Sequence, residues 1–274
     1  MAYKEPLDEL IVGSVSYAED LSFHALIDLS EIVSEKKIED ARVIGGHMVT
    51  FHVQRWGLGA ALYRATLDAD LGVPPIVART ERIVDALEDR GYERYTGNRY
   101  RREIQELRDH VEENFAVVDV LIPAYTSRPR ENVRVDDKLT TIEVPGLAAA
   151  LLAKPVTVSV KLSPRTGGER QIELRLPDER CGLVLKAFAW RQRSAGKDIV
   201  DVWRLLEVGA VAGISVGAQM GEDGALASRL IRSAFSELGS EGTRALVAEL
   251  KLNEAAARER FARIQALMDR VLPT

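Results

Sequence analysis

The spacing of apolar residues predicts two different halves in this chain. In the first half, short apolar runs are interleaved with segments of helical spacing. Apolar and polar side chains alternate at residues 156–162 and again at residues 172–176. A loop that contains Pro and Gly separates these two segments, so we predict a β-hairpin. From residue 182 onward, the spacing predicts only helices, at residues 183–193, 197–208, 225–238, 241–251 and 253–271. We therefore expect an α/β (α+β) fold, with a mixed-sheet domain over residues 1–180 and a helical domain over residues 181–274.

Turn and capping residues divide the first half further. A helix is expected over residues 21–37, and a short strand over residues 41–44 ends at Gly45 and Gly46, before a helix over residues 47–56. Another helix is expected over residues 80–90, with Thr80 as its N-cap and Gly91 as its stop. The segment 123–144 is polar and rich in turn residues, and its role stays open.

Three aspartates stand in runs that otherwise predict buried strands. Asp68 and Asp70 lie in the run of residues 65–73, and Asp119 lies in the run of residues 117–122. Strand side chains alternate, so Asp68 and Asp70 are expected to share one face. Carboxylates that cluster in a partly buried site repel one another unless a positive charge neutralises them. A divalent cation can do so, and hard oxygen ligands select Mg²⁺ or Mn²⁺. We expect a metal site; the alternatives are exposed carboxylates on an edge strand and a buried Asp119 paired with an arginine.

The composition narrows the class of protein. The 274 residues are 46% hydrophobic and 29% charged, which is ordinary for a soluble globular chain with one or two cores. The net charge of −5 argues against an overall basic surface for nucleic acid. The single cysteine, Cys181, excludes an intramolecular disulfide and a cysteine-based zinc site. Without an apolar run of membrane-spanning length, we expect a cytoplasmic protein that does not enter a membrane.

The order of these features resembles a known superfamily. The order resembles the signature of the DNA polymerase β-like nucleotidyltransferases: a strand, Gly45-Gly46, a helix, the pair Asp68 and Asp70, and then Asp119. Three further features are similar to the AbiEii-type (abortive-infection, MenT-like toxin) branch. They are the long spacing between the glycines and the aspartate pair, the Arg-Ala-Thr that precedes Asp68 by a few residues, and the downstream segments 186–191 and 197–202. The resemblance covers about residues 41–206.

This resemblance implies a metal-dependent enzyme. It would move a nucleoside monophosphate from an NTP to a hydroxyl acceptor and release pyrophosphate. Asp68 and Asp70 would bind two Mg²⁺ or Mn²⁺ ions, and Asp119 would bind the catalytic ion and help to deprotonate the acceptor. The implied biology is the toxin of a toxin–antitoxin pair that modifies tRNA or a protein and has a cognate antitoxin as partner.

The same resemblance implies a nucleotide site. Gly45 and Gly46 would let backbone N–H groups at a helix N-terminus approach the β- and γ-phosphates. Lys186 would neutralise the triphosphate, and Asp198 would belong to the nucleotide-binding helix. The alternatives are a plain strand-to-helix turn for the glycines, a snorkelling lysine for Lys186, and helix capping with a salt bridge to Lys197 or Arg204 for Asp198 and Asp201.

Other readings stay open. The chain is alternatively a catalytically silent nucleotide-binding or interaction protein of the same fold, or a nucleotidyltransferase that acts on a small molecule such as an antibiotic. Arg64 either reaches the site or balances the aspartates. The run Arg99, Arg101 and Arg102 is typical of a solvated face, with contact to RNA phosphates as the alternative. His47 and His52 are interpreted as structural.

Overall fold

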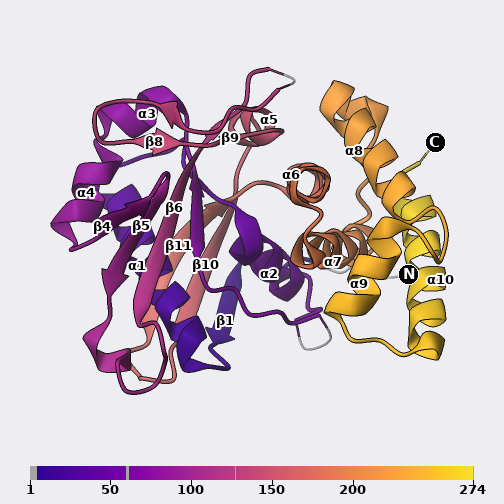
Figure 1. Ribbon diagram of the computed structural model, residues 1–274, viewed down its shortest axis with the longest axis horizontal. Helices are drawn as coiled ribbons and strands as arrows, with labels where there is room; N and C mark the ends of the chain where they lie inside the picture. Colours follow the sequence, from indigo (N-terminus) through magenta and orange to yellow (C-terminus); the bar gives the residue numbers. More distant parts are fainter. Residues whose placement is uncertain (1–4, 60–61, 127, 274) are drawn as a thin grey trace. The chain divides into compact units, whose positions relative to one another are not determined.

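The structure is a computed structural model that describes residues 5–59, 62–126 and 128–273, and its mixed helices and strands confirm the predicted α+β class (Figure 1). The chain divides into two compact units. The sheet unit holds Leu7–Phe51 and Tyr63–Asp178, and the helical unit holds Met1–Pro6, His52–Leu62 and Glu179–Thr274. The sequence pattern does not predict that the short segment His52–Leu62 belongs to the helical unit.

The main sheet of the sheet unit has the strand order β2-β3-β6-β5-β4, and β9 pairs with the end of β6. Its strands are β2 (Arg42–Val43), β3 (Ala69–Gly72), β4 (Glu93–Thr96), β5 (Arg99–Glu103), β6 (Phe115–Pro123) and β9 (Glu143–Val144). β6 runs parallel to β3 and β9 and antiparallel to β5. β6 is therefore the strand on which side chains from β3 and β5 meet.

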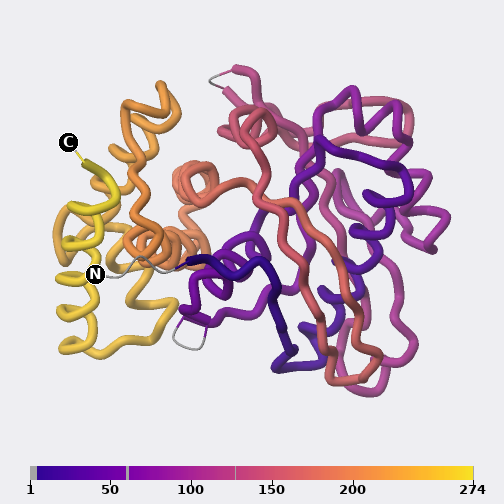
Figure 2. Tube along the Cα trace, turned by 180° about the vertical axis from the view of Figure 1, so that it is seen from behind, coloured from indigo at the N-terminus to yellow at the C-terminus, as the bar shows by residue number. Residues whose placement is uncertain are grey.

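A second sheet in the same unit has the order β1-β10-β11. β1 (Glu9–Gly13) runs parallel to β10 (Val156–Ser163), and β10 and β11 (Arg170–Leu176) form the expected hairpin, which Figure 2 shows as adjacent salmon tubes next to the indigo β1. Two short strands in the unassigned segment, β7 (Val133–Arg134) and β8 (Thr140–Thr141), form a pair of their own. The turn-rich segment thus contributes β7, β8 and β9.

One long helix covers the apolar face of the sheet unit. α1 (Tyr17–Glu35) starts at Ser16, whose hydroxyl accepts a hydrogen bond from the Glu19 N–H, and packs against β3, β6 and β11. Its buried residues join Leu71 and Val120 in one core. Alternation along β3 and β6 turns these apolar side chains one way and the aspartates the other. The remaining helices of the unit are α3 (Pro75–Thr80), α4 (Ile83–Asp89), α5 (Leu147–Leu152) and a 3₁₀ helix at Gln105–Leu107.

Two predicted elements of this unit are wrong in detail. The expected helix over residues 80–90 is the shorter α4, which starts only at Ile83, because Arg82 has a φ of 49° that breaks the helical path after α3. Thr80 is not an N-cap; its hydroxyl donates to the Ile76 carbonyl at 3.0 Å at the end of α3. The strand predicted through Asp68 starts only at Ala69, because pairing with β6 starts there.

The helical unit is built from packed helices. They are α6 (Glu179–Arg193), α7 (Gly196–Ala212), a 3₁₀ helix at Ala218–Met220, α8 (Gly221–Ala234), α9 (Glu241–Glu249) and α10 (Glu254–Val271). α7 contacts α6, α9 and α10, and each helix expected from the sequence is present with shifted ends. α2 (Gly45–Arg55) starts in the sheet unit, and its residues from His52 onward are counted with the helical unit.

Within the described residues, no helix is both long enough and apolar enough to cross a membrane.

Candidate functional site

The three predicted aspartates come together in the sheet unit. The parallel pairing of β3 and β6 places Asp70 beside Asp119, and Asp68 precedes β3 by one residue. One carboxylate oxygen from each aspartate lies within 4.8 Å of the others. Asp119 is buried, whereas Asp68 and Asp70 are half-buried, so the cluster is reachable from solvent.

An arginine that the sequence reading placed in a solvated charge run lies on this cluster. The antiparallel register of β5 and β6 puts Arg99 opposite Asp119. Arg99 Nη2 is 2.6 Å from Asp119 Oδ2 and 3.0 Å from Asp68 Oδ2, and Arg99 Nε is 3.1 Å from Asp119 Oδ1. Asn98 Nδ2 also donates to Asp119 Oδ1 at 3.0 Å. The hydrogen bond with Asp119 raises the pKa of the Arg99 guanidinium, so the group stays charged at every physiological pH.

A sequence signal for the position of Arg99 at the start of a strand lies in the turn before it. Thr96 pairs with Arg99 across a two-residue turn, Gly97-Asn98, which is a hairpin signature. The other arginines of the run have separate partners: Arg101 pairs with Glu93, and Arg102 pairs with Asp28.

Gly45 is where α2 begins, and it has no room for a side chain. Its φ is +68°, and a Cβ on it would lie 1.7 Å from Asp70 Oδ2. The neighbouring Ile44 N–H donates to the Asp70 carbonyl at 3.0 Å. A Cβ on Gly46 would lie 2.5 Å from Thr66 Oγ1 and 3.0 Å from Arg64 Nη2. Gly45 is therefore required so that the start of α2 can approach Asp70 this closely, and Gly46 so that it can approach Thr66 and Arg64.

Two buried polar atoms at the same helix start have no hydrogen-bond partner among the described residues. They are Thr66 Oγ1 and His47 Nε2. Burial lowers the pKa of His47 to about 4, although the nearby Asp68 opposes this, so the imidazole is neutral at pH 7. Buried polar atoms are rarely left unpaired, and orphaned groups beside a helix N-terminus indicate a place where a polar ligand binds.

The other two predicted site residues, Lys186 and Asp198, lie in the helical unit and meet there. Lys186 Nζ is 2.8 Å from Asp201 Oδ2 and 3.7 Å from Asp198 Oδ1. Arg204 pairs with Asp201 at 2.9 Å, and Arg193 binds Asp198 through two nitrogens at 2.8 and 3.0 Å. The contacts of Lys186 and Arg193 join α6 to α7. The Arg204–Asp201 pair lies within α7 and matches the salt-bridge alternative for Asp201, and the role of Lys186 and Asp198 in nucleotide binding stays a prediction.

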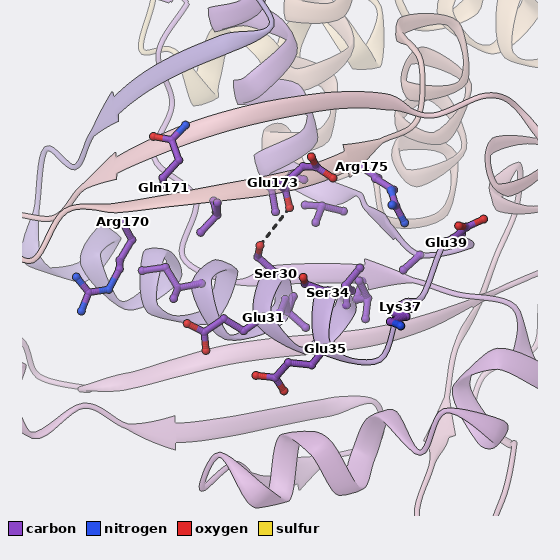
Figure 3. A pocket seen from close by; sticks show the side chains of 18 residues that line it. Ser30, Glu31, Ser34, Glu35, Lys37, Glu39, Arg170, Gln171, Glu173 and Arg175 are labelled. Carbon is purple, nitrogen blue, oxygen red and sulfur yellow. Dashed lines mark hydrogen bonds between the residues drawn. The ribbon is translucent and has the colours of Figure 1, made fainter.

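A cavity of about 650 Å³ in the sheet unit lies apart from the aspartates. Figure 3 shows it between α1 and β11, where the Ser30 hydroxyl donates to the Glu173 carbonyl at 3.1 Å. Leu71 lines it, and Leu71 faces the side of β3 opposite to Asp70. None of the predicted site residues lines this cavity.

No protein-family model matches the chain, and no curated protein is significantly similar to it. The resemblance to nucleotidyltransferases therefore rests on the sequence motifs alone and stays a prediction.

Proposed function

We propose that this protein is a metal-dependent nucleotidyltransferase that moves a nucleoside monophosphate from an NTP to a hydroxyl acceptor and releases pyrophosphate. One observation carries the proposal. Three carboxylates whose oxygens lie within 4.8 Å of one another stand at the start of a helix whose first residue, Gly45, leaves no space for a side chain above Asp70.

The residues present fit a divalent cation with a triphosphate. Asp68, Asp70 and Asp119 offer only hard oxygen donors, which suit Mg²⁺ or Mn²⁺. Beside them, the first turn of α2 has backbone N–H groups without a carbonyl partner inside the helix, and the helix dipole there favours negative charge. The unpartnered Thr66 Oγ1 lies at the same place and can donate a hydrogen bond to a phosphate oxygen.

When bound, Mg²⁺ or Mn²⁺ supplies charge stabilisation for the attacking and leaving oxygens. The residues of the chain orient the reactants. The start of α2 binds the β- and γ-phosphates through Gly45 and Gly46, and the Asp119 carboxylate accepts the proton of the acceptor hydroxyl. The acceptor oxygen forms its bond to the α-phosphorus as the bond from that phosphorus to the bridging oxygen breaks, and the electron pair leaves with pyrophosphate. Catalysis rests on positioning and electrostatics.

The acceptor class follows from the resemblance and not from the site. We propose tRNA or a protein hydroxyl as the acceptor, with the protein acting as a toxin that a cognate antitoxin neutralises. A small-molecule acceptor is the alternative within the same chemistry.

The direct test is label transfer. Wild type and the Asp68→Ala/Asp70→Ala variant are incubated with each α-³²P-labelled NTP, Mg²⁺ or Mn²⁺ and a host cell extract, and both labelled products and released pyrophosphate are measured. RNase-sensitive label from wild type alone identifies an RNA acceptor, and protease-sensitive label identifies a protein acceptor. Pyrophosphate release without macromolecular label identifies a small-molecule acceptor. If wild type releases no more pyrophosphate than the variant with any NTP, the proposal is wrong.

The ion pairs of Arg99 favour a second candidate, a nucleotide-binding protein without chemistry. A guanidinium at 2.6 Å from Asp119 and 3.0 Å from Asp68 partly neutralises the carboxylates without a metal. Such a protein would be stabilised by an NTP equally well with Mn²⁺ and with a chelator, whereas the enzyme requires Mn²⁺ for this stabilisation.

A further inference from the structure

Arg99 is fixed on the aspartates by the fold itself. Its position opposite Asp119 is set by the β5–β6 register, and the two-residue turn that precedes it brings Asn98 onto the same carboxylate. Asp119 thus accepts three hydrogen bonds from two consecutive residues of one hairpin. The Arg99 fork also reaches Asp68, so one guanidinium bridges two of the three carboxylates.

Arg99 contacts both carboxylate oxygens of Asp119 and one of Asp68, on two of the three aspartates that could hold a divalent cation. Mg²⁺ binds carboxylate oxygens at about 2.1 Å, and a guanidinium bonded to the same oxygens would stand within a few ångströms of the ion. Like charges at that separation repel each other strongly in a partly buried place. A cation that binds Asp68 and Asp119 together must therefore displace Arg99 from at least one of them.

We propose that Arg99 is a built-in counter-cation of the aspartate cluster, which the metal and the triphosphate displace together. This inference rests on the proposed function and adds how the site is loaded. The metal alone binds weakly because Arg99 must give up its carboxylates without a replacement. The triphosphate supplies that replacement, since the released guanidinium fork pairs with its phosphate oxygens. Arg99 therefore couples metal binding to nucleotide binding, and it is a positioning residue that excludes metal without substrate.

The test is Mn²⁺ affinity, measured from the electron paramagnetic resonance signal of free Mn²⁺. Wild type, Arg99→Gln and Arg101→Gln are compared with Mn²⁺ alone and with α,β-methylene analogues of the four NTPs. Arg101 is the matched control: it lies on the same strand and the same face, but pairs with Glu93. We expect Arg99→Gln to bind Mn²⁺ alone on the order of 10-fold more tightly than wild type, with Arg101→Gln unchanged. The gain in Mn²⁺ affinity on adding the analogue should be smaller in Arg99→Gln than in wild type.

The outcomes separate this inference from the proposed function. Equal Mn²⁺ affinity of Arg99→Gln and wild type, with Mn²⁺ bound by both, overturns the role of Arg99 and leaves the nucleotidyltransferase proposal standing. No Mn²⁺ binding by any of the proteins, with or without an analogue, overturns both. If Arg99→Gln does not fold, Arg99→Lys decides: a lysine keeps the charge but cannot bridge both carboxylates, so a smaller tightening in the same direction is expected.

Discussion

The two ionic clusters of this protein differ in the balance between positive and negative charge. In the helical unit, Asp198 and Asp201 face three cations, and the side chains of Lys186, Asp201 and Arg204 are at most 7% exposed. In the sheet unit, three aspartates lie beside Arg99, and the side chains of Arg99 and Asp68 are 37% and 30% exposed.

This difference indicates what each cluster does. In the helical cluster both carboxylates have cationic partners, and Lys186, Asp201 and Arg204 are closed to solvent, which is typical of a network that joins two helices. The aspartate cluster has more negative than positive charge and is open, which leaves a deficit that a ligand can fill. Four predictions test this comparison, from the largest expected effect on stability to the smallest.

Removing a carboxylate from the helical cluster should destabilise the protein most. Asp201→Ala leaves Lys186 and Arg204 buried without the carboxylate that both contact. Breaking a buried pair from one side costs about 3–5 kcal/mol. Urea unfolding of the variant measures this loss. A change below 1 kcal/mol would mean that the cluster is not a structural network.

Acid should weaken the helical unit through Glu179. Burial opposes its charged form, but the close contact with the His52 imidazole and the hydrogen bond from Trp56 outweigh burial and lower the pKa of Glu179 to about 2. Because the folded-state pKa is depressed, the stabilisation is complete above the unfolded value of about 4.5 and is lost as the pH falls toward 2. The contribution is about 3 kcal/mol.

The measurement is unfolding of wild type and Glu179→Gln between pH 2 and pH 7. The stability of wild type should exceed that of the variant near neutral pH, and the difference should shrink below pH 4.5. A difference that is constant with pH would contradict the assignment.

A methyl group at the start of α2 should damage the site more than the fold. Gly45→Ala adds backbone strain of about 1–2 kcal/mol, because φ is +68°, and places its Cβ on Asp70. Gly168→Ala, in the loop between β10 and β11, is the control, since its φ is +76° but a Cβ there meets nothing within 4 Å. We expect both variants to lose some stability, and only Gly45→Ala to lose stabilisation by Mn²⁺ with an NTP. If Mn²⁺ with an NTP stabilises both variants equally, Gly45 is not part of the binding site.

Neutralising an open aspartate should change stability least. Asp68→Asn loses one partly exposed ion pair with Arg99, so the change should be below about 1 kcal/mol. The same substitution should weaken Mn²⁺ binding. A stability loss as large as that of Asp201→Ala would show that both clusters are structural, and the comparison would fail.

Local patterns were sufficient for much of the fold. The alternation at residues 156–162 and 172–176 predicted the β10–β11 hairpin, and helical spacing after residue 182 predicted the helices of the helical unit. Thr80 shows the limit of local signals: a good capping residue ends α3 instead, because Pro74-Pro75 starts a helix upstream and Arg82 breaks the path.

The site shows the same division between local and non-local information. The convergence of Asp70 and Asp119 was expected because carboxylates on buried strands need one common partner. The role of Arg99 was not, because it depends on which residue of β6 lies opposite, and register is set by pairing far along the chain. Lys186 sits among apolar residues in the middle of α6, and only the structure shows that Asp201 is its partner.

The central claim is that the aspartate cluster binds a divalent cation together with an NTP. The most direct measurement is the melting temperature of wild type and of Asp68→Ala/Asp70→Ala, with Mn²⁺ alone, each NTP alone, and both together. The account predicts a rise in wild type only when both are present, and no rise in the variant. An equal rise in the variant, or no rise of wild type with any of the four NTPs, would contradict it.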